Sequence, residues 1–423
     1  MHIVMVTNVV APDKLGGLER YVRELSAEIV RQGHLVTVVS KRTHELQPLQ
    51  EEFADGVKVQ RYEVPSKRDP LFVIKYPFSV ATGVSRAISA AMVPHETGST
   101  IIHGHFPLPM IYPLLRRMPY VYTCHAPVHK EILDERQDSY RLPAIVQDAF
   151  IGTFKVVEKL VIRSAKRVVT LSQFVCDEVV ELTAKPPEGV TRIPGGLDTS
   201  WFSPEPQPET REPAKGPRLF TARRLVSRTG VEELIRAMPF VLEQKPDARL
   251  TVAGDGPLRE RLQRIITELG LHETVHLVGR ISDADLRDWY RRADIAVTPT
   301  RTLEGFGLST VEAMACGAVP LVTPVAANPE IVGKLSSLLV APGADARGIA
   351  DGVLKLWQAP AYTSLRASVR SEVHPRLGWP EVCRQYLDLY RDVSKNTGRP
   401  SAAGGLGAEQ GLRGGLKPAP ARS

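Results

Sequence analysis

The sequence predicts an α/β protein with two doubly wound domains that face each other across a cleft. Short β-prone runs alternate with helical stretches in each half, a Pro-rich segment at 203–217 separates the halves, and glycine loops follow several of the runs. Such alternation is typical of parallel sheets covered by helices, and ligands usually bind at the strand carboxyl ends. A chain of 423 residues is also longer than one typical core.

The individual elements follow from these patterns. In the first half the predicted strands are HIVMVTN, LVTVVSK, TIIHGH, YVYTCH and RVVTLS, with a helix from Leu18 to Gln32 that ends at Gly33. In the second half the predicted strands are RLFTAR, RLTVAGDG, VHLVGR, DIAVTPT, VPLVTP and SLLVAPG, each followed by a helical stretch. The expected organisation is a first domain at 1–200, a linker at 201–217, a second domain at 218–375, a helix at 376–394 that crosses back onto the first domain, and a disordered basic tail at 395–423.

Composition indicates an ordinary globular protein, with 43% hydrophobic and 24% charged residues. The first apolar run lacks a basic leader, no run approaches the length of a membrane span, and the four cysteines have no ligand-like spacing. We therefore expect a cytoplasmic protein with reduced thiols. Homo-oligomerisation leaves no clear mark in the sequence.

The formal net charge of +7 is concentrated at one end. Five of the basic residues and only one acid lie in 395–423, so the rest of the chain is close to balanced. No stripe of alternating aromatic and basic residues is present, and we expect no nucleic-acid partner. The helix predicted at 145–169 is amphipathic with lysines on its polar face, which fits peripheral contact with an anionic membrane, although a core-packing helix with a solvated face is the commoner explanation.

The stretch EGFGLSTVEAMACGAVP, at 304–320, holds two carboxylates around a glycine loop. The pattern predicts a strand, a loop and a helix, so that the N–H groups of Phe306, Gly307 and Leu308 lie at a helix N-terminus, where an anion is favoured. Glu304 would lie in the loop and Glu312 inside the helix. Carboxylates accept hydrogen bonds from hydroxyls and repel phosphate, and a nucleotide sugar presents both groups.

Two other loops are candidates for phosphate contacts. Gly16 and Gly17 precede a helix after the first strand, although a plain tight turn is the commoner explanation for such a pair. In the second half, Arg223, Arg224 and Arg228 lie between a strand and a helix, where their guanidinium groups would match phosphate oxygens. The alternative is a solvated charge cluster.

Four histidines, His103, His105, His125 and His129, lie near the ends of predicted strands in the first half. No carboxylate or cysteine falls at metal-ligand spacing, and there is no H-E-x-x-H motif. We therefore favour structural or substrate-contacting roles and predict no metal site. His125 ends a predicted strand and is placed to reach the cleft.

Taken together, these residues resemble glycosyltransferase family 4, the retaining, nucleotide-sugar-dependent enzymes of GT-B fold. The matching pieces are GGLERY, YTCHAP, LSQFVCDEV, RIPGGLDTSWFSP, TARRLVSRTG, VAGDGPL, VHLVGR and the 304–320 stretch, from the first strand to about residue 390. The resemblance implies that the first domain binds the acceptor, with loops at 42–80 and 125–145, and that the second binds the donor. It also implies no cofactor and no required metal.

The resemblance further implies roles for single residues. Glu304 would contact the transferred sugar near its reacting carbon, and His125 would also meet that sugar. Glu312 would bind the ribose hydroxyls. The remaining donor contacts would come from Arg224 and from the backbone at Gly16, Gly17, Phe306, Gly307 and Leu308 for the diphosphate, and from Val278, Gly279 and Arg280 for the base.

Two departures from the family pattern stand out. Thr229 replaces the lysine that usually binds the diphosphate, so Arg228 or Arg223 would have to compensate. Gly195 replaces an asparagine, a change expected mainly to affect backbone freedom. The first departure leaves open a catalytically impaired nucleotide-sugar binder. An NAD-dependent oxidoreductase is disfavoured, because no G-x-G-x-x-G follows the first strand.

Overall fold

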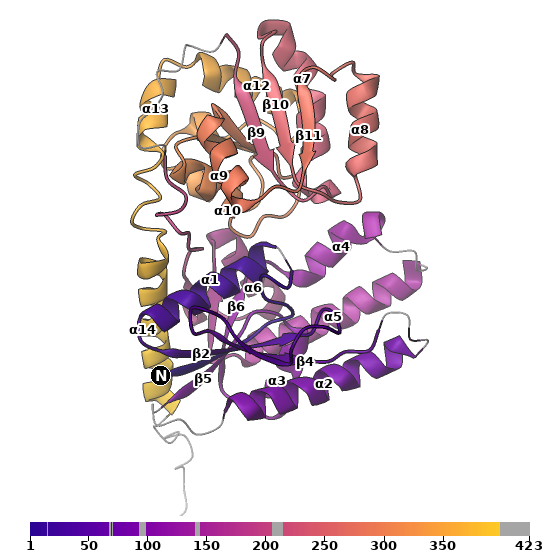
Figure 1. The fold of residues 1–423 in the computed structure, drawn as a ribbon, viewed down its shortest axis with the longest axis vertical. Coiled ribbons are helices and arrows are strands. Elements are labelled where there is room, and N and C mark those ends of the chain that lie inside the picture. Colours follow the sequence, from indigo (N-terminus) through magenta and orange to yellow (C-terminus); the bar gives the residue numbers. More distant parts are fainter. Residues whose placement is uncertain are drawn as a thin grey trace, which may run out of the picture.

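The computed structural model describes residues 1–14, 16–66, 69, 71–92, 99–139, 144–204 and 215–397. Within them the chain forms two α/β domains, one above the other in Figure 1. Most of the Pro-rich segment and almost all of the tail predicted at 395–423 lie outside the described residues.

The first domain is built on a sheet with strand order β3-β4-β2-β1-β5-β6-β7-β8. Every neighbouring pair is parallel except β3 and β4. The strands are β1 (His2–Val6), β2 (Leu35–Lys41), β3 (Gln50–Glu52), β4 (Lys58–Tyr62), β5 (Thr100–Gly104), β6 (Tyr120–Cys124), β7 (Arg167–Thr170) and β8 (Val190–Arg192). The helices are α1 (Gly17–Arg31), α2 (Phe72–Ala91), α3 (Ile111–Leu115), α4 (Val128–Ser139), α5 (Ala144–Ser164) and α6 (Gln173–Thr183).

The second domain has a sheet of order β11-β10-β9-β12-β13, with all pairs parallel. Its strands are β9 (Arg218–Ala222), β10 (Arg249–Ala253), β11 (Val275–Gly279), β12 (Ile295–Thr298) and β13 (Val319–Val322). Its helices are α7 (Val231–Gln244), α8 (Arg259–Glu268), α9 (Asp283–Arg292), α10 (Leu308–Ala315), α11 (Asn328–Val332), α12 (Ala346–Gln358) and α13 (Tyr362–Ser368). The core strands are continuous apolar runs because helices cover both faces of each sheet.

Most predicted strands are confirmed, and three regions differ. The run SLLVAPG was expected to be a strand, but it forms a 3₁₀ turn at Ser337–Leu339 and a single bridge between Val322 and Val340. Pro342 follows at once and lacks the N–H that a ladder needs. The segments 42–80 and 125–145 were both expected to be acceptor loops. The first contains β3, β4 and the start of α2, with β4 paired to β2, and the second contains α4.

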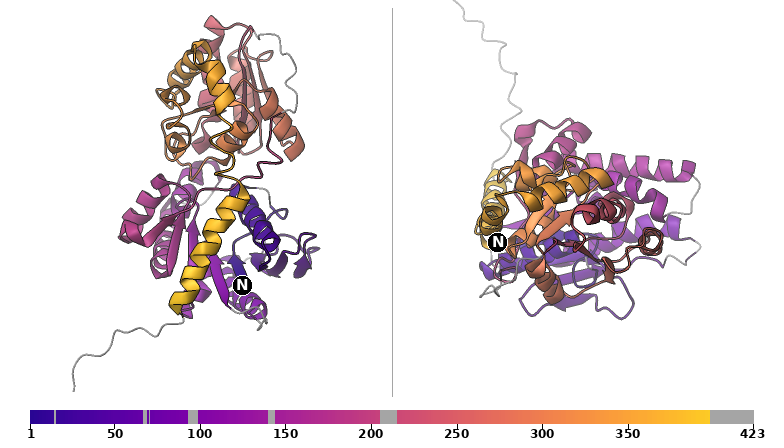
Figure 2. Two further views of the ribbon diagram at one scale, coloured as in Figure 1. Left: turned by 90° about the vertical axis from the view of Figure 1, so that its left-hand side faces the viewer. Right: turned by 90° about the horizontal axis from the view of Figure 1, so that it is seen from above.

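The helix α14 (Trp379–Thr397) runs from the second domain down along the first, as Figure 2 shows. Its two buried tyrosines bond to the first domain: Tyr386 Oη lies 2.8 Å from Tyr21 Oη, and Tyr390 Oη lies 2.7 Å from His103 Nδ1. Trp379 Nε1 donates to Glu24 of α1 at 2.5 Å. These contacts hold α14 against α1 and β5 of the first domain.

All four cysteines are free and buried. Among the described helices, none has the length and apolar character that crossing a membrane requires.

Candidate active site

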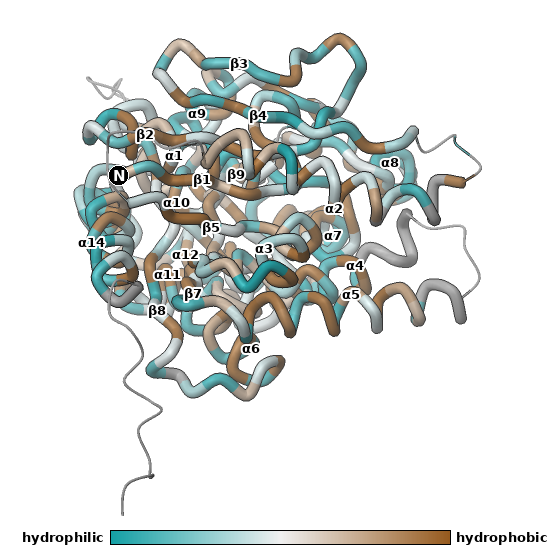
Figure 3. Tube along the Cα trace, turned by 90° about the horizontal axis from the view of Figure 1, so that it is seen from below, coloured by the Kyte–Doolittle hydropathy of each residue, from teal (hydrophilic) through white to brown (hydrophobic). Residues whose placement is uncertain are grey.

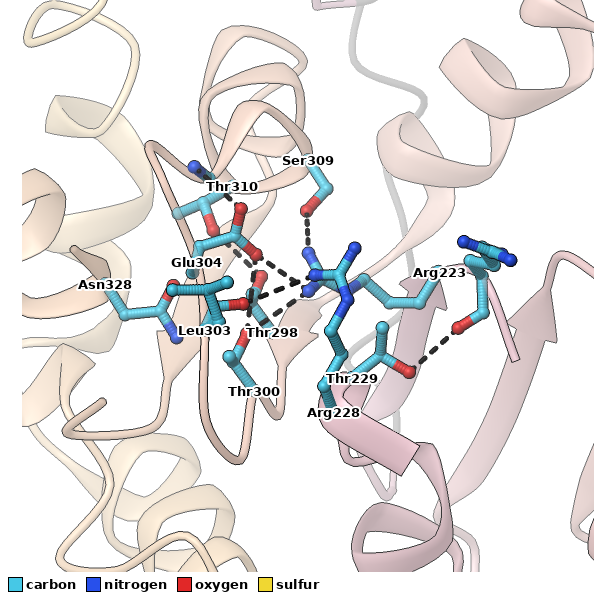
Figure 4. Close-up of polar contacts among 12 residues, drawn as sticks. Arg223, Arg228, Thr229, Thr298, Thr300, Leu303, Glu304, Ser309, Thr310 and Asn328 are labelled. Carbon is cyan, nitrogen blue, oxygen red and sulfur yellow. Dashed lines mark hydrogen bonds and ion pairs between the residues drawn. The ribbon is translucent and has the colours of Figure 1, made fainter. Parts of the chain in front are cut away.

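The glycine loop between β12 and α10 forms as the sequence predicts. Gly307 is the N-cap of α10 and has a φ of 86°, a left-handed conformation that favours glycine. Its N–H donates to Glu304 Oε1 at 3.1 Å, so the Glu304 carboxylate lies at the positive end of this helix. Glu304 Oε2 lies 2.7 Å from Arg223 Nη2 (Figure 4). The structure thus brings together an acid, an arginine and the amide donors of one helix.

The arginine loop after β9 separates its four candidate residues. The Arg223 guanidinium reaches α10, where Nη1 donates to Ser309 Oγ at 3.2 Å. The Arg224 side chain is exposed. The Arg228 guanidinium donates to the Leu303 carbonyl at 3.4 Å and lies 3.4 Å from Glu131 of α4. Thr229 is buried, and its hydroxyl is 2.8 Å from each of the backbone oxygens of Arg224 and Val226.

Glu312 lies inside α10 and faces the first domain. Its Oε1 is 3.5 Å from Nη1 of Arg20, which belongs to α1, and its Oε2 accepts from the Tyr290 hydroxyl at 3.5 Å. Burial raises the pKa of Glu312 to about 7, and the charge of Arg20 opposes this rise. Arg20 also contacts Glu24 at 2.6 Å and Asp283 of α9 at 3.5 Å. Arg20 was not predicted to lie at the site, and its place in the GGLERY stretch was the one indication of it.

The Gly-Gly turn after β1 lies against the same helix. Gly16 is the N-cap of α1, and a Cβ on Gly17 would lie 3.9 Å from Leu308 Cδ1, so these two loops meet at the domain boundary. The Phe306 ring packs on Gly195, where a Cβ would be 2.5 Å from the ring. The interpretation of Gly195 as a site of backbone freedom is therefore wrong: its φ is not positive, and glycine is needed there to make room for Phe306.

The histidines fall into two groups, and neither is a metal site within the described ranges. His129 Nδ1 pairs with buried Glu158 at 2.6 Å. His105 links Met5 Sδ, 3.3 Å from its Nε2, to His125 Nε2, 3.1 Å from its Nδ1. Because sulfur only accepts, His105 carries its proton on Nε2, so His125 donates from Nε2 and keeps Nδ1 as an acceptor. Burial lowers the pKa of His125 to about 3, which leaves the ring neutral at pH 7.

His125 and the Glu304 loop also touch through their backbones. A Cβ built on Gly305 would lie 1.9 Å from the His125 carbonyl oxygen, so the two chains are in close contact across the domain boundary. Val278 and Gly279, predicted to line the base pocket, end the edge strand β11, and Gly279 packs against Arg259. These two residues lie at the same carboxyl-terminal end of the sheet as Glu304, but not in the cluster around it.

Further contacts across the boundary were not predicted. Glu330 of α11 accepts from the N–H groups of Gln173 and Phe174 at the start of α6, at 2.7 and 2.6 Å. Thr302 donates to Asp134 of α4 at 2.5 Å. A cavity of about 10 Å³, lined by residues of both domains that include Arg20 and Glu312, lies between α1 and α10. The domains therefore meet closely at the predicted site.

Comparison with known families decides what kind of protein carries this site. A model of Glycosyltransferase Family 4 matches residues 15–201, and a model of Glycosyl transferases group 1 matches residues 203–372. The chain belongs to glycosyltransferase family 4. The predicted fold class is confirmed as well, because this glycosyltransferase shares the GT-B architecture of the solved structures that resemble it.

Several relatives span nearly the whole glycosyltransferase. A D-inositol 3-phosphate glycosyltransferase of Thermobispora bispora is 26% identical over 92% of each chain. A GDP-mannose-dependent alpha-(1-6)-phosphatidylinositol monomannoside mannosyltransferase of Mycolicibacterium smegmatis is 28% identical over 85% of this chain and 90% of the relative. The sucrose-phosphate synthase structure from Thermosynechococcus elongatus superposes with a TM-score of 0.74 at 22% identity, covering 94% of this chain and 100% of that one. Anabaena HepE in complex with UDP gives 0.66 at 17% identity, covering 93% and 100%.

The contact between Gly305 and His125 generates a prediction about domain closure. Gly305→Ala places a methyl group against the His125 carbonyl, so we expect the loop or the domain to move away, at a cost of about 1–3 kcal/mol in the free energy of unfolding. Small-angle scattering should show a larger radius of gyration, and the thermal midpoint should fall. Gly152→Ala is the matched control, because no atom lies within 4 Å of a Cβ there. Identical scattering and midpoints for Gly305→Ala and wild type would contradict the contact.

Proposed function

We propose that this glycosyltransferase moves a sugar from a nucleotide-diphosphate sugar to an acceptor hydroxyl, with retention of the anomeric configuration and without a metal ion. The observation that carries the proposal is the position of Glu304: its carboxylate lies at the N-terminus of α10, beside Arg223, in a loop that touches His125. The GDP-mannose dependence named for a mycobacterial relative and the UDP bound by HepE support a donor of this class.

The geometry suggests how the bond changes would be assisted. The bond between the anomeric carbon and the diphosphate oxygen breaks, and the departing charge is stabilised by Arg224 and the amides at Gly307 and Leu308. The acceptor oxygen attacks the same face of the sugar, and its proton passes to the departing phosphate oxygen. Glu304 would stabilise the positive charge that develops on the sugar, and neutral His125 would accept a hydrogen bond from a sugar hydroxyl at Nδ1.

A second candidate is a binder of nucleotide sugars that does not turn them over. It is favoured by one observation: Thr229, in place of the usual lysine, is buried and bonded to its own loop, so it brings no charge to the diphosphate. The two candidates differ in turnover but not in donor binding.

Contact with an anionic membrane surface stays a prediction, with some support from the first domain. The helices α2, α3 and α5 lie side by side there, as Figure 3 shows from below. They and the turn after α3 expose the apolar residues Phe78, Leu115, Phe150, Val156 and Leu160, and the basic residues Lys75, Arg86, Arg116, Arg117, Lys155, Lys159 and Arg163. Within the described side chains of these three helices, Asp148 is the one exposed acid. Apolar and basic groups on one face suit an interfacial helix.

The donor class is tested by thermal shift with UDP-, GDP- and ADP-sugars in the presence of EDTA, followed by hydrolysis and transfer assays. We expect sugars of one base to raise the melting temperature, because a ligand that binds the native state stabilises it.

We expect Glu304→Gln to retain the fold and the contact with Gly307 N–H but to lower turnover by about 100-fold or more. Binding of a donor without turnover by wild type would favour the binder, and wild-type rates in Glu304→Gln would remove Glu304 from the mechanism.

The raised pKa of Glu312 predicts a pH dependence of donor affinity. Ribose hydroxyls donate best to an ionised carboxylate, so binding must remove the proton that Glu312 holds below about pH 7. Affinity for a nucleotide sugar should therefore rise from about pH 6 to pH 8, by no more than ~10-fold per pH unit. Calorimetry measures the affinity at each pH. Glu312→Gln cannot ionise at this position, so its affinity should be the same at each pH. A flat profile for wild type would contradict the role of Glu312.

For the membrane contact, Lys155→Glu combined with Lys159→Glu should reduce co-sedimentation with phosphatidylserine vesicles about tenfold or more, because each lysine near an anionic surface contributes ~1 kcal/mol. The matched control is Lys334→Glu with Lys355→Glu, two exposed lysines of the second domain. Equal binding of both double variants, or no binding of wild type, would refute this surface.

A further inference from the structure

We propose that Arg223 supplies the diphosphate-binding charge that Thr229 does not, and that Glu304 holds this arginine in place until a donor binds. The inference rests on the proposed donor class and adds a specific cation to it. Thr229 itself cannot bind the diphosphate, because its short side chain is buried and its hydroxyl lies 2.8 Å from two backbone oxygens of its own loop.

The Arg223 guanidinium lies beside the first turn of α10. Nη1 contacts Ser309 in the first turn of α10, and Nη2 contacts Thr300 Oγ1 at 3.2 Å, in the loop after β12. The group therefore lies at the N-terminus of α10, next to the amides proposed to receive the phosphates. The Arg223 backbone is fixed there, since its N–H donates to the Ala253 carbonyl at 2.9 Å and its own carbonyl leaves no room for a Cβ on Gly254.

The Arg223 guanidinium also has the capacity to bind the oxygens of a ligand. The Arg223 side chain is only 10% exposed, yet its Nε has no hydrogen-bond partner within the described part of the chain. A buried donor without a partner is costly, and an oxygen of a ligand would satisfy it. Arginine also offers two or more donors in a plane, which matches the oxygens of a phosphate.

The neighbouring arginine is placed differently. Arg228 points to the domain boundary. There it contacts the Leu303 carbonyl, as Figure 4 shows, and Glu131 of α4. Moving it to the diphosphate would break the contact with Glu131 between the domains. Arg223 needs no such movement, because its guanidinium already lies between the arginine loop and α10.

Glu304 explains how Arg223 is kept there. Its carboxylate bridges Arg223 Nη2 at 2.7 Å and the Gly307 N–H at 3.1 Å, and these are the two kinds of donor that a diphosphate would use. A diphosphate carries more negative charge than one carboxylate, so it would replace Glu304 on both donors. Glu304 would then turn from Arg223 to the sugar. Binding of the donor would therefore also place the Glu304 carboxylate beside the sugar.

The test compares diphosphate binding with nucleoside binding. Dissociation constants are measured for UDP, GDP and ADP and for uridine, guanosine and adenosine, with wild type and Arg223→Ala. For the base that wild type prefers, Arg223→Ala should lose about tenfold or more in affinity for the diphosphate and less than about twofold for the nucleoside. Arg223→Lys, which keeps the charge, should recover part of the loss.

The matched control is Arg236→Ala, an arginine of α7 whose side chain is 44% exposed and pairs only locally with Glu232. It should bind both kinds of ligand as wild type does. An equal loss of diphosphate and nucleoside affinity in Arg223→Ala, or no loss, would overturn the inference and leave the donor class standing. A diphosphate-specific loss in Arg228→Ala instead would assign the charge to Arg228. Failure of wild type to bind any of the three diphosphates would refute both the donor class and the inference.

Discussion

One negative charge at the start of a helix organises the domain boundary of this protein. The Glu304 carboxylate accepts from the Gly307 amide and pairs with Arg223, so it joins the loop after β12 to the loop after β9. Two positions of the short loop that carries it favour glycine, because Gly305 touches the His125 carbonyl and Gly307 has a positive φ. The position of the acid therefore depends on two glycines and one arginine from separate parts of the chain.

The second acid, Glu312, depends on the way the two domains meet. Its neighbour Arg20 belongs to α1, and the next residue, Tyr21, shares a hydrogen bond with Tyr386 of α14 and contacts the His125 ring edge-on at 4.7 Å. The helix that returns from the second domain thus supports the same turn of α1 that contacts Glu312 of α10. Packing of α14 and the geometry of the site are connected through one buried tyrosine.

Much of the fold and part of the site could be predicted from local sequence. Alternating apolar runs and glycine loops identified β12, the turn at Gly307 and α10, because these signals lie within about twenty residues. The pairing of Arg223 with Glu304 could not be predicted, since it joins two loops of the second domain that are far apart in the chain. The capping of α6 by Glu330 could not be predicted either, because it depends on how the two domains meet. Gly195 was misjudged for the same reason: what requires glycine there is the ring of Phe306 from the other domain.

The route of α14 has a consequence for dissecting the molecule into fragments. A polypeptide ending near Pro204 would contain every strand of the first sheet, but it would lack the hydroxyl groups of Tyr386 and Tyr390 that satisfy Tyr21 and His103. It would also expose the apolar surface that this helix covers. A soluble fragment of that half would need the helix supplied separately, by non-covalent complementation with a peptide or by a circular permutation that attaches it ahead of β1.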